Sequence, residues 1–374
     1  MRINSGLDYE EWVDVYRQLI NWELKIDSAN SVGMVDILST QKTDANAEFS
    51  KFVERNYTNW LDGSGPTMSN TLMRSKILPH VKDDQPTVML LLDNLRYDQW
   101  KMLEPIFTEF FRVEEEDFFY SILPTTTQYS RNAIFAGMMP ADIEKHYKDW
   151  WYNDNEEGGK NMHEADLLEQ QLNRVVRREL KFEYVKVTNT NFAKRLPDNA
   201  LNYLNNDLTV IVYNFIDMLS HARTEMEVLK ELAGDETAYR SLTRSWFLHS
   251  PLWTALQIMA EREIRLIVTT DHGTIRVKTP SRVVGDRETT TNLRYKVGRN
   301  LQYERRDVLD FRDPRKVGLP RPNVSSTFIF AKEDKYFLYP NNYNYYNNYY
   351  RDTFQHGGIS LEEIICPVIR LSSK

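Results

Sequence analysis

Apolar residues are distributed differently before and after about residue 80. Up to residue 61 they recur every three or four positions, as on one face of an amphipathic helix. The residues that define this period are Trp12, Val15, Tyr16, Leu19, Ile20, Phe49, Phe52 and Val53. A cluster of helix-breaking residues follows, from Gly63 to Pro66. The pattern predicts a small helical bundle or linker module over residues 1–80 and a second domain over residues 81–374.

Beyond residue 80, short apolar runs alternate with helical patterns. The runs Thr87–Leu92, Leu208–Tyr213 and Ile264–Thr269 are continuously apolar, which is typical of parallel strands buried on both faces. Helical patterns lie near residues 96–107, 128–137, 166–178, 190–204, 222–232 and 240–261. Together they predict an α/β sandwich with a mainly parallel central sheet. The stretch from Tyr336 to Tyr350, rich in Asn and Tyr, is predicted to be an aromatic loop or hairpin.

An acidic residue follows each of the three apolar runs, where a strand would end, and a histidine follows two of them. They are Asp93, Asp217, His221, Asp271 and His272. A fourth segment adds His356, which two glycines follow, and glycine lets the backbone approach closely. Ligands of mainly parallel sheets bind beyond the carboxyl ends of the strands, so we expect these side chains to share one site.

A strand-end carboxylate has two interpretations. As a helix cap, any one of these acids is equally well explained. A cap does not require a histidine beside Asp271, a histidine four residues after Asp217, or a glycine-flanked histidine near the C-terminus. Asp and His are ligands that Zn²⁺ accepts at about 2.0–2.2 Å, with open positions for water or substrate. The four segments together therefore favour a metal site.

A candidate nucleophile lies in the segment from Leu123 to Arg131, which contains Thr125, Thr126 and Thr127. A hydroxyl at a helix start can sit beside backbone N–H groups that favour the charge of a phosphate. The alternative is a capping threonine, which is common at helix starts. A free threonine is a poor nucleophile, so its activation would require metal coordination.

These segments resemble the PglZ domain of the alkaline phosphatase superfamily. The matching motifs are Leu-Leu-Asp93-Asn-Leu-Arg96-Tyr, Pro124-Thr-Thr-Thr127 running to Gly137, Asp217-x-x-x-His221, Thr-Thr-Asp271-His272-Gly273 and His356-Gly-Gly-Ile-Ser-Leu-Glu-Glu-Ile-Ile-Cys-Pro-Val. With the helical module in front, the chain is similar to the C-terminal part of PorX-type response regulators, which are associated with type IX secretion. The resemblance implies an alkaline-phosphatase-like fold and an upstream phospho-receiver domain as signalling partner.

The resemblance also implies two bound divalent ions, Zn²⁺ or alternatively Mn²⁺. One ion would be held by Asp217, His221 and His356, and the other by Asp93, Asp271, His272 and the hydroxyl of Thr127. Thr127 is preferred as the nucleophile because related phosphodiesterases carry Pro-Thr-x-Thr with the second threonine acting, although its two neighbours stay open. The implied reaction is an in-line displacement at phosphorus through a phospho-threonine intermediate.

Three basic residues are candidates for binding substrate: Arg96, Arg294 and Lys296. A salt bridge that fixes the metal loop explains Arg96 equally well, and an ordinary solvated strand would look much like the segment of Arg294 and Lys296. The tyrosines between Tyr343 and Tyr350 could stack on bases at the mouth of the site or pack within a hairpin.

Composition narrows the class of protein. The 374 residues are 41% hydrophobic and 27% charged, with a net charge of −7, which argues against a generally basic coat for nucleic acid. Cys366 is the only cysteine, and no apolar run approaches the roughly 20 residues of a membrane span. We therefore expect a cytoplasmic protein with no membrane contact, in which the amphipathic helices offer a surface for a homodimer.

The function predicted is a metal-dependent phosphodiesterase acting on linear or cyclic oligonucleotides or nucleotides. The absence of a recognisable third-metal cluster of the monoesterase kind supports this preference. The alternatives are a phosphomonoesterase or phosphomutase, and a signalling output domain that binds metal without turnover.

Overall fold

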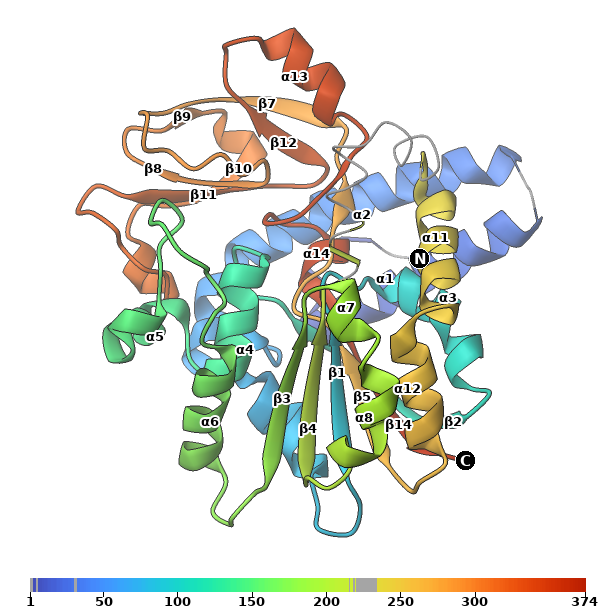
Figure 1. The fold of residues 1–374 in the computed structure, drawn as a ribbon. Helices are drawn as coiled ribbons and strands as arrows, with labels where there is room; N and C mark the ends of the chain where they lie inside the picture. The colour runs from blue at the N-terminus through green and yellow to red at the C-terminus, as the bar shows by residue number, and fades with distance from the viewer. Residues whose placement is uncertain (1–2, 5, 30–31, 215, 218, 220–233) are drawn as a thin grey trace.

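The computed structural model describes residues 3–4, 6–29, 32–214, 216–217, 219 and 234–374 (Figure 1). Its centre is a six-stranded sheet in the order β2-β14-β5-β1-β4-β3. The strands are β1 (Thr87–Leu92), β2 (Phe111–Tyr120), β3 (Phe182–Val187), β4 (Leu208–Tyr213), β5 (Arg265–Thr269) and β14 (Ile365–Ser373). Strand β1 pairs in parallel with β4 and β5, and β3 pairs in parallel with β4, whereas β14 is antiparallel to β5 and β2. The predicted α/β sandwich with a mainly parallel sheet is confirmed.

Helices flank this sheet, except α13, which lies on the β strands above it (Figure 1). The helices are α1 (Tyr9–Ala29), α2 (Val32–Asn59), α3 (Tyr97–Phe107), α4 (Asn132–Ala136), α5 (Pro140–His146), α6 (Glu164–Val175), α7 (Thr190–Ala193), α8 (Leu196–Tyr203), α11 (Glu236–Leu248), α12 (Pro251–Ala260), α13 (Tyr343–Tyr350) and α14 (Leu361–Ile364). The pattern predicted over 240–261 is two helices, because Ser250 caps a new helix at Pro251 by accepting a hydrogen bond from the Trp253 backbone. The helical pattern near 222–232 falls outside the described residues.

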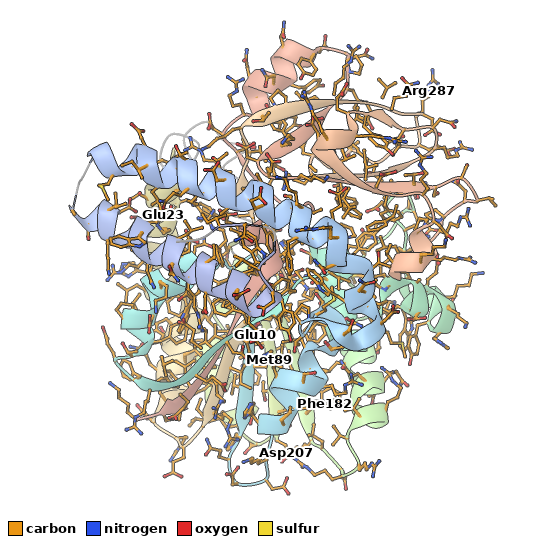
Figure 2. The ribbon with its side chains drawn as sticks, turned by 180° about the vertical axis from the view of Figure 1, so that it is seen from behind. Glu10, Glu23, Met89, Phe182, Asp207 and Arg287 are labelled. Atoms are coloured by element: carbon orange, nitrogen blue, oxygen red, sulfur yellow. The ribbon has the colours of Figure 1, made fainter. Side chains whose placement is uncertain are left out.

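A second β region lies beyond the carboxyl ends of the parallel strands (Figure 1). It contains β6 (Ile275–Arg276), β7 (Thr279–Val284), β8 (Tyr295–Gly298), β9 (Gln302–Tyr303), β10 (Val308–Phe311), β11 (Thr327–Ala331), β12 (Lys335–Leu338) and β13 (Phe354–Gln355). These strands form small sheets in the orders β10-β11-β8, β12-β7-β9 and β13-β6. Figure 2 shows Arg287 in this region, at the opposite end of the molecule from Asp207, which precedes β4. The second β region therefore stands over the edge of the central sheet at which a site was predicted.

The tyrosine-rich stretch folds differently from the prediction. Tyr343–Tyr350 is helix α13, not a loop or hairpin. Its rings stack in two pairs at helical spacing, Tyr345 on Tyr349 and Tyr346 on Tyr350, with centroids 6.2 and 6.1 Å apart. Contacts four residues apart stabilise a helix, and they explain why a segment of strand-forming tyrosines is helical here.

The helical module packs directly on the sheet. Figure 2 shows the hairpin of α1 and α2 across the rear of the molecule. Its apolar residues belong to the same continuous core as the strands. Tyr120 at the end of β2 contacts both Phe49 and Trp60, with ring centroids 6.3 and 5.4 Å apart. The domain boundary near residue 80 stays a prediction, but the two parts share one hydrophobic core. Among the described residues, no helix combines the length and apolar character needed to cross a bilayer.

Two tryptophans of α1 provide a test of this packing. Trp12 is fully buried against Phe49 and Phe52, whereas Trp22 in the same helix is 52% exposed. Trp12→Ala should lower the free energy of unfolding by about 3–5 kcal/mol, because it removes a large buried side chain. Trp22→Ala should change it by no more than about 0.5 kcal/mol. Urea denaturation followed by circular dichroism measures both, and equal effects would contradict the packing described.

Candidate metal centre

Parallel pairing brings the predicted ligands to one edge of the sheet. Leu92 at the end of β1 lies opposite Tyr213 at the end of β4, and Leu91 lies opposite Thr269 at the end of β5. The chain leaves β1 into Asp93, whose backbone N–H donates to the Tyr213 carbonyl at 3.0 Å. The loops that follow the three strands are therefore neighbours, as the strand order requires.

Asp93, Asp271 and His272 form a compact buried cluster. One ligand atom from each lies within 4.8 Å of the others. The Nε2 atom of His272 is 3.7 Å from Asp93 Oδ1 and 3.9 Å from Asp271 Oδ2. The Thr127 hydroxyl lies beside this cluster, 3.3 Å from Asp93 Oδ1 and 3.2 Å from His272 Nε2. These four predicted residues are brought together.

The chemistry of this cluster fits a divalent cation. Burial raises the pKa of Asp93, and the neighbouring Asp271 raises it further. Burial also raises the pKa of Asp271 and lowers that of His272, which favours the neutral imidazole that a metal requires. Among the described residues, no hydrogen bond reaches the buried Asp271 Oδ2. A cation would satisfy this oxygen and offset the charge of both carboxylates.

The orientation of the His272 ring suits ligation. Its Nδ1 atom lies 3.0 Å from the carbonyl oxygen of Gly273. A proton on Nδ1 would be donated to that carbonyl, and the lone pair of Nε2 would then face Thr127 and Asp93. Backbone carbonyls commonly fix metal-binding histidines in this way.

Arg131 is a member of the site that the sequence interpretation missed. Its Nη1 atom lies 2.9 Å from Asp93 Oδ2 and 3.0 Å from the side-chain oxygen of Asn214, and its Nε atom lies 2.6 Å from Glu164. The guanidinium thus holds one oxygen of Asp93 and leaves the other toward Thr127. The spacing in the sequence could have indicated this role, because Arg131 follows Thr127 by four residues at a helix start and lies on the same helical face.

A second group of predicted ligands lies beside the cluster. The His356 ring stacks on the His272 ring, with centroids 4.3 Å apart. Its Nε2 atom is 3.5 Å from Asp217 Oδ1, and its Nδ1 atom is 3.2 Å from the carbonyl oxygen of Thr125. His221, predicted as the third ligand of this group, lies outside the described residues. Asp217 and His356 are therefore adjacent to the first cluster.

Two of the three threonines of the candidate segment, Thr125 and Thr127, differ in their contacts. The Thr125 hydroxyl donates to the Gly358 carbonyl and accepts from the Gly357 N–H, both at 3.0 Å, so it holds the loop that carries His356. The Thr127 hydroxyl contacts the metal cluster. Its backbone carbonyl accepts a hydrogen bond from Asn161 at 3.1 Å. This geometry favours Thr127 over Thr125 as the reacting residue.

The three residues predicted to bind substrate are all buried among protein partners. Arg96 forms ion pairs with Asp98 and Glu236, and Arg294 pairs with Glu363. The Lys296 ammonium donates to the Thr290 carbonyl at 3.0 Å and lies 4.6 Å from the centre of the Tyr339 ring. Burial lowers the pKa of Lys296 to about 7. Substrate contact by these side chains stays a prediction, and their described contacts favour a structural role.

A cleft of about 740 Å³ opens onto the centre. Its lining includes Thr127, Asp217 and His356, so both groups of predicted ligands reach it. The opposite wall comes from the second β region and from the end of α13, including Arg287, Tyr295, Tyr349 and Tyr350. The volume lies within the roughly 300–1,000 Å³ range of small-molecule sites.

Solved structures similar to this chain share little sequence with it. Murine ectonucleotide pyrophosphatase/phosphodiesterase 5 is 11% identical, with a TM-score of 0.46 over 77% of this chain and 88% of that chain. Phosphonoacetate hydrolase from Sinorhizobium meliloti, in complex with phosphonoformate, is 12% identical, with a TM-score of 0.48 over 76% of this chain and 89% of that chain. At these levels the likeness carries no argument about function.

Two family models match the chain. The model described as the BREX system PglZ alkaline phosphatase-like domain matches residues 72–371, and the model described as the PorX response regulator linker domain matches residues 1–61. No curated protein is significantly similar to the chain. Both parts of the resemblance inferred from the sequence motifs are confirmed. Because the PglZ model spans most of its length, the chain belongs to the family of PglZ alkaline phosphatase-like domains.

Proposed function

We propose that this chain is a metal-dependent phosphodiesterase with Thr127 as its nucleophile. The observation that carries the proposal is the position of the Thr127 hydroxyl, 3.3 Å from Asp93 Oδ1 and 3.2 Å from His272 Nε2. Asp93 and His272, together with Asp271, are the residues whose ligand atoms converge. A hydroxyl within hydrogen-bonding distance of carboxylate and imidazole ligands is positioned to react at phosphorus.

Two sets of residues would hold two divalent cations, Zn²⁺ or Mn²⁺. Asp93, Asp271, His272 and Thr127 form one set, and Asp217, His221 and His356 form the other. Asp and His suit both metals, so the ligands alone do not select one. When bound, the cations would lower the pKa of the hydroxyl and offset the charge that develops on phosphorus.

The residues of the chain itself would have four roles in the reaction. Thr127 Oγ1 forms a bond to phosphorus while the bond to the leaving ester oxygen breaks, and water later cleaves the phospho-threonine. Asp93 and His272 hold the hydroxyl in position through contacts of 3.3 and 3.2 Å. Arg131 keeps Asp93 in place by holding its other oxygen. Asn161 fixes the backbone of the nucleophile through the Thr127 carbonyl.

The cleft supports a diester with nucleotide groups as substrate class. A phosphodiester carries two substituents on phosphorus, and the cleft of about 740 Å³ has room for both. Tyr349 and Tyr350 lie in its wall with Lys160 and Arg287, which offers aromatic rings for bases and cations for phosphates. Linear or cyclic oligonucleotides and nucleotides have this chemistry. A phosphomonoesterase or phosphomutase, and a metal-binding output domain without turnover, are the alternatives.

The helical module supports a signalling role for the enzyme. Residues 1–61 match the linker domain of PorX response regulators, which motivates our proposal that the chain is the output part of such a regulator. In this proposal an upstream receiver domain controls it, the domains divide near residue 80, and a homodimer forms in the cytoplasm in connection with type IX secretion. Size-exclusion chromatography with light scattering tests the dimer.

Two aryl esters distinguish the candidate functions. The proposed enzyme should hydrolyse bis-p-nitrophenyl phosphate with a kcat/KM at least about tenfold above that for p-nitrophenyl phosphate, because the cleft accepts a second ester group. Release of p-nitrophenolate, measured on stripped protein with Zn²⁺ or Mn²⁺ added back, gives both values. A preference for the monoester would favour a phosphomonoesterase. Turnover of neither ester would favour an output domain that only binds metal.

Replacing the nucleophile gives a sharper test. Thr127→Ala should lower kcat by about three orders of magnitude or more while leaving the fold intact, because the attacking oxygen is removed. Thr127→Ser should retain part of the activity, since it keeps a hydroxyl at the same position. Thr125→Ala separates the two threonines: it removes the hydroxyl that holds Gly357 and Gly358, and it should lower kcat less than Thr127→Ala. If Thr127→Ala retained activity and Thr125→Ala lost all of it, the assignment of the nucleophile would be wrong.

Metal content tests the ligand assignment independently of turnover. Protein purified without chelators should contain two divalent ions per chain, and chelation should abolish ester hydrolysis until Zn²⁺ or Mn²⁺ is restored. His272→Ala should lower the metal content to about one ion, because it removes a ligand of the buried cluster. His249→Ala is the control, since His249 is exposed at the end of α11. Inductively coupled plasma mass spectrometry gives the stoichiometry, and equal contents in both variants would exclude the assignment.

A further inference from the structure

A network of buried ion pairs joins the helical module to the loops of the metal centre. Its members are Glu23 and Asp27 of α1, Lys42 and Asn46 of α2, Arg96, Asp98, Glu236, Arg240 and Glu362. The side chains of Arg96, Asp98 and Arg240 are no more than 2% exposed. None of these residues belongs to the sets proposed to hold metal. The network therefore needs an explanation of its own.

One limb of the network runs from α1 to the loop that carries Asp93. Glu23 Oε1 is 3.0 Å from Nη1 of Arg240, and the same nitrogen is 2.9 Å from Asp98 Oδ2. Asp98 in turn accepts from Nε and Nη2 of Arg96 through its two carboxylate oxygens. Arg96 is three residues after Asp93 and directly precedes α3, where its backbone N–H donates to Gln99 Oε1 at 2.9 Å. This limb ends on the strand-to-helix loop of the first ligand.

The other limb runs from α2 to the segment that follows His356. Glu23 Oε2 is 2.8 Å from the ammonium of Lys42, which is 3.6 Å from Glu362 Oε1. Asn46 reinforces the contact from the same helix. It donates to Glu362 Oε2 at 3.1 Å and accepts from the Leu361 backbone N–H at 2.8 Å. The two oxygens of Glu23 therefore each begin one limb.

The two limbs converge at Gly273, which directly follows His272. A Cβ atom at Gly273 would clash with the backbone oxygen of Glu362 and lie 3.4 Å from Cγ of Arg96. The Gly273 N–H also donates to the Glu363 carbonyl at 3.2 Å. A displacement of either Arg96 or Glu362 would be transmitted to the backbone beside His272, since this close packing leaves no space to absorb it.

Electrostatics makes these residues move together. Burial alone would raise the pKa of Asp98, but Arg96 and Arg240 outweigh it and hold that pKa below its ordinary value. A buried charge that loses its partner is strongly unfavourable, so each member follows its neighbour. The network also borders a cavity of about 430 Å³ lined by Glu23, Lys42 and other residues between the hairpin and the sheet domain. Among the residues that the structure describes, the side of the hairpin that faces this cavity is not closely packed.

We infer that Glu23, in the helical module, is a positioning residue for the catalytic centre. Glu23 lies on the α1–α2 hairpin (Figure 2). Its two ion pairs fix the loops of Asp93 and of His356 relative to each other, so that the position of the hairpin sets the alignment of the two ligand groups. The inference rests on the proposed function. It gives the linker a role in turnover, because a signal that moves the hairpin changes the alignment of the ligands.

Glu23→Gln tests this role, since it keeps the size of the side chain and removes its charge. In the metal-loaded full chain, we expect kcat for bis-p-nitrophenyl phosphate to fall about tenfold, with KM changed by less than about twofold. The dissociation constants for Zn²⁺, from competition with a chromophoric chelator, should rise about tenfold. A residue that only stabilises the fold would lower the melting temperature and leave kcat and metal affinity of the folded protein unchanged, which would overturn the inference.

Two further variants make the test specific. Glu54→Gln is the matched control, because Glu54 of α2 forms an ion pair of 2.8 Å with Lys332, outside the network. It should leave kcat and metal affinity at wild-type values. Glu23→Gln combined with Asp98→Asn should lower kcat by less than the product of the single effects, since both act through one limb. If the two effects multiplied independently, Glu23 and Asp98 would not act through one limb.

Asp27→Asn covers the case in which Glu23→Gln does not fold. Asp27 also pairs with Arg240 but is 27% exposed, so its replacement is better tolerated. It should lower kcat in the same direction by a smaller factor, and a wild-type kcat would count against the inference. If the wild-type chain binds metal but hydrolyses neither ester, the proposed function fails. In that case the Zn²⁺ dissociation constants of the same variants decide whether Glu23 positions the ligands.

Discussion

The parallel pairing of β1 with β4 and β5 is the constraint on which the rest of this structure depends. Because these strands run in one direction and in register, their carboxyl ends bring Asp93, Asp217 and Asp271 to one edge of the sheet. The nucleophile segment, the second β region and the segment that carries His356 are all arranged around that edge. A sheet with the same strands in antiparallel order would have distributed the three acids over both edges.

Burying several carboxylates together is electrostatically unfavourable. The surrounding residues offset part of this cost. Burial and mutual repulsion raise the pKa of Asp93. Arg131 offsets part of this charge, and a divalent cation would offset the remainder. Burial lowers the pKa of His272, which keeps the imidazole available as a ligand. The same charges that would bind a cation therefore explain why Arg131 and Glu164 are buried together behind the ligands.

The helical module contacts the PglZ domain through two kinds of interaction with different consequences. Apolar contacts such as that of Trp60 with Tyr120 contribute stability but tolerate small shifts. The ion pairs of Glu23 are directional, and their partners Lys42 and Arg240 pair in turn with Glu362 and Asp98. A helical module attached by apolar contacts alone would stabilise the PglZ domain without affecting the metal centre. With both kinds, its position and the geometry of the centre are linked.

The sequence by itself determined the three central parallel strands β1, β4 and β5, the acids that follow them and the family, because buried parallel strands are continuously apolar and the ligand motifs are local. It did not determine which side chains meet. Arg96 and Arg294 are of a residue type that often binds phosphate, and the sequence suggested them as substrate-binding residues. In the structure they form ion pairs with Asp98 and Glu363. Helix α13 likewise depends on tyrosine contacts that a pattern of strand-forming residues does not reveal. Local patterns fix elements and their ends, whereas the pairing of buried charges is decided by tertiary structure, since partners far apart in the chain compete for each charge.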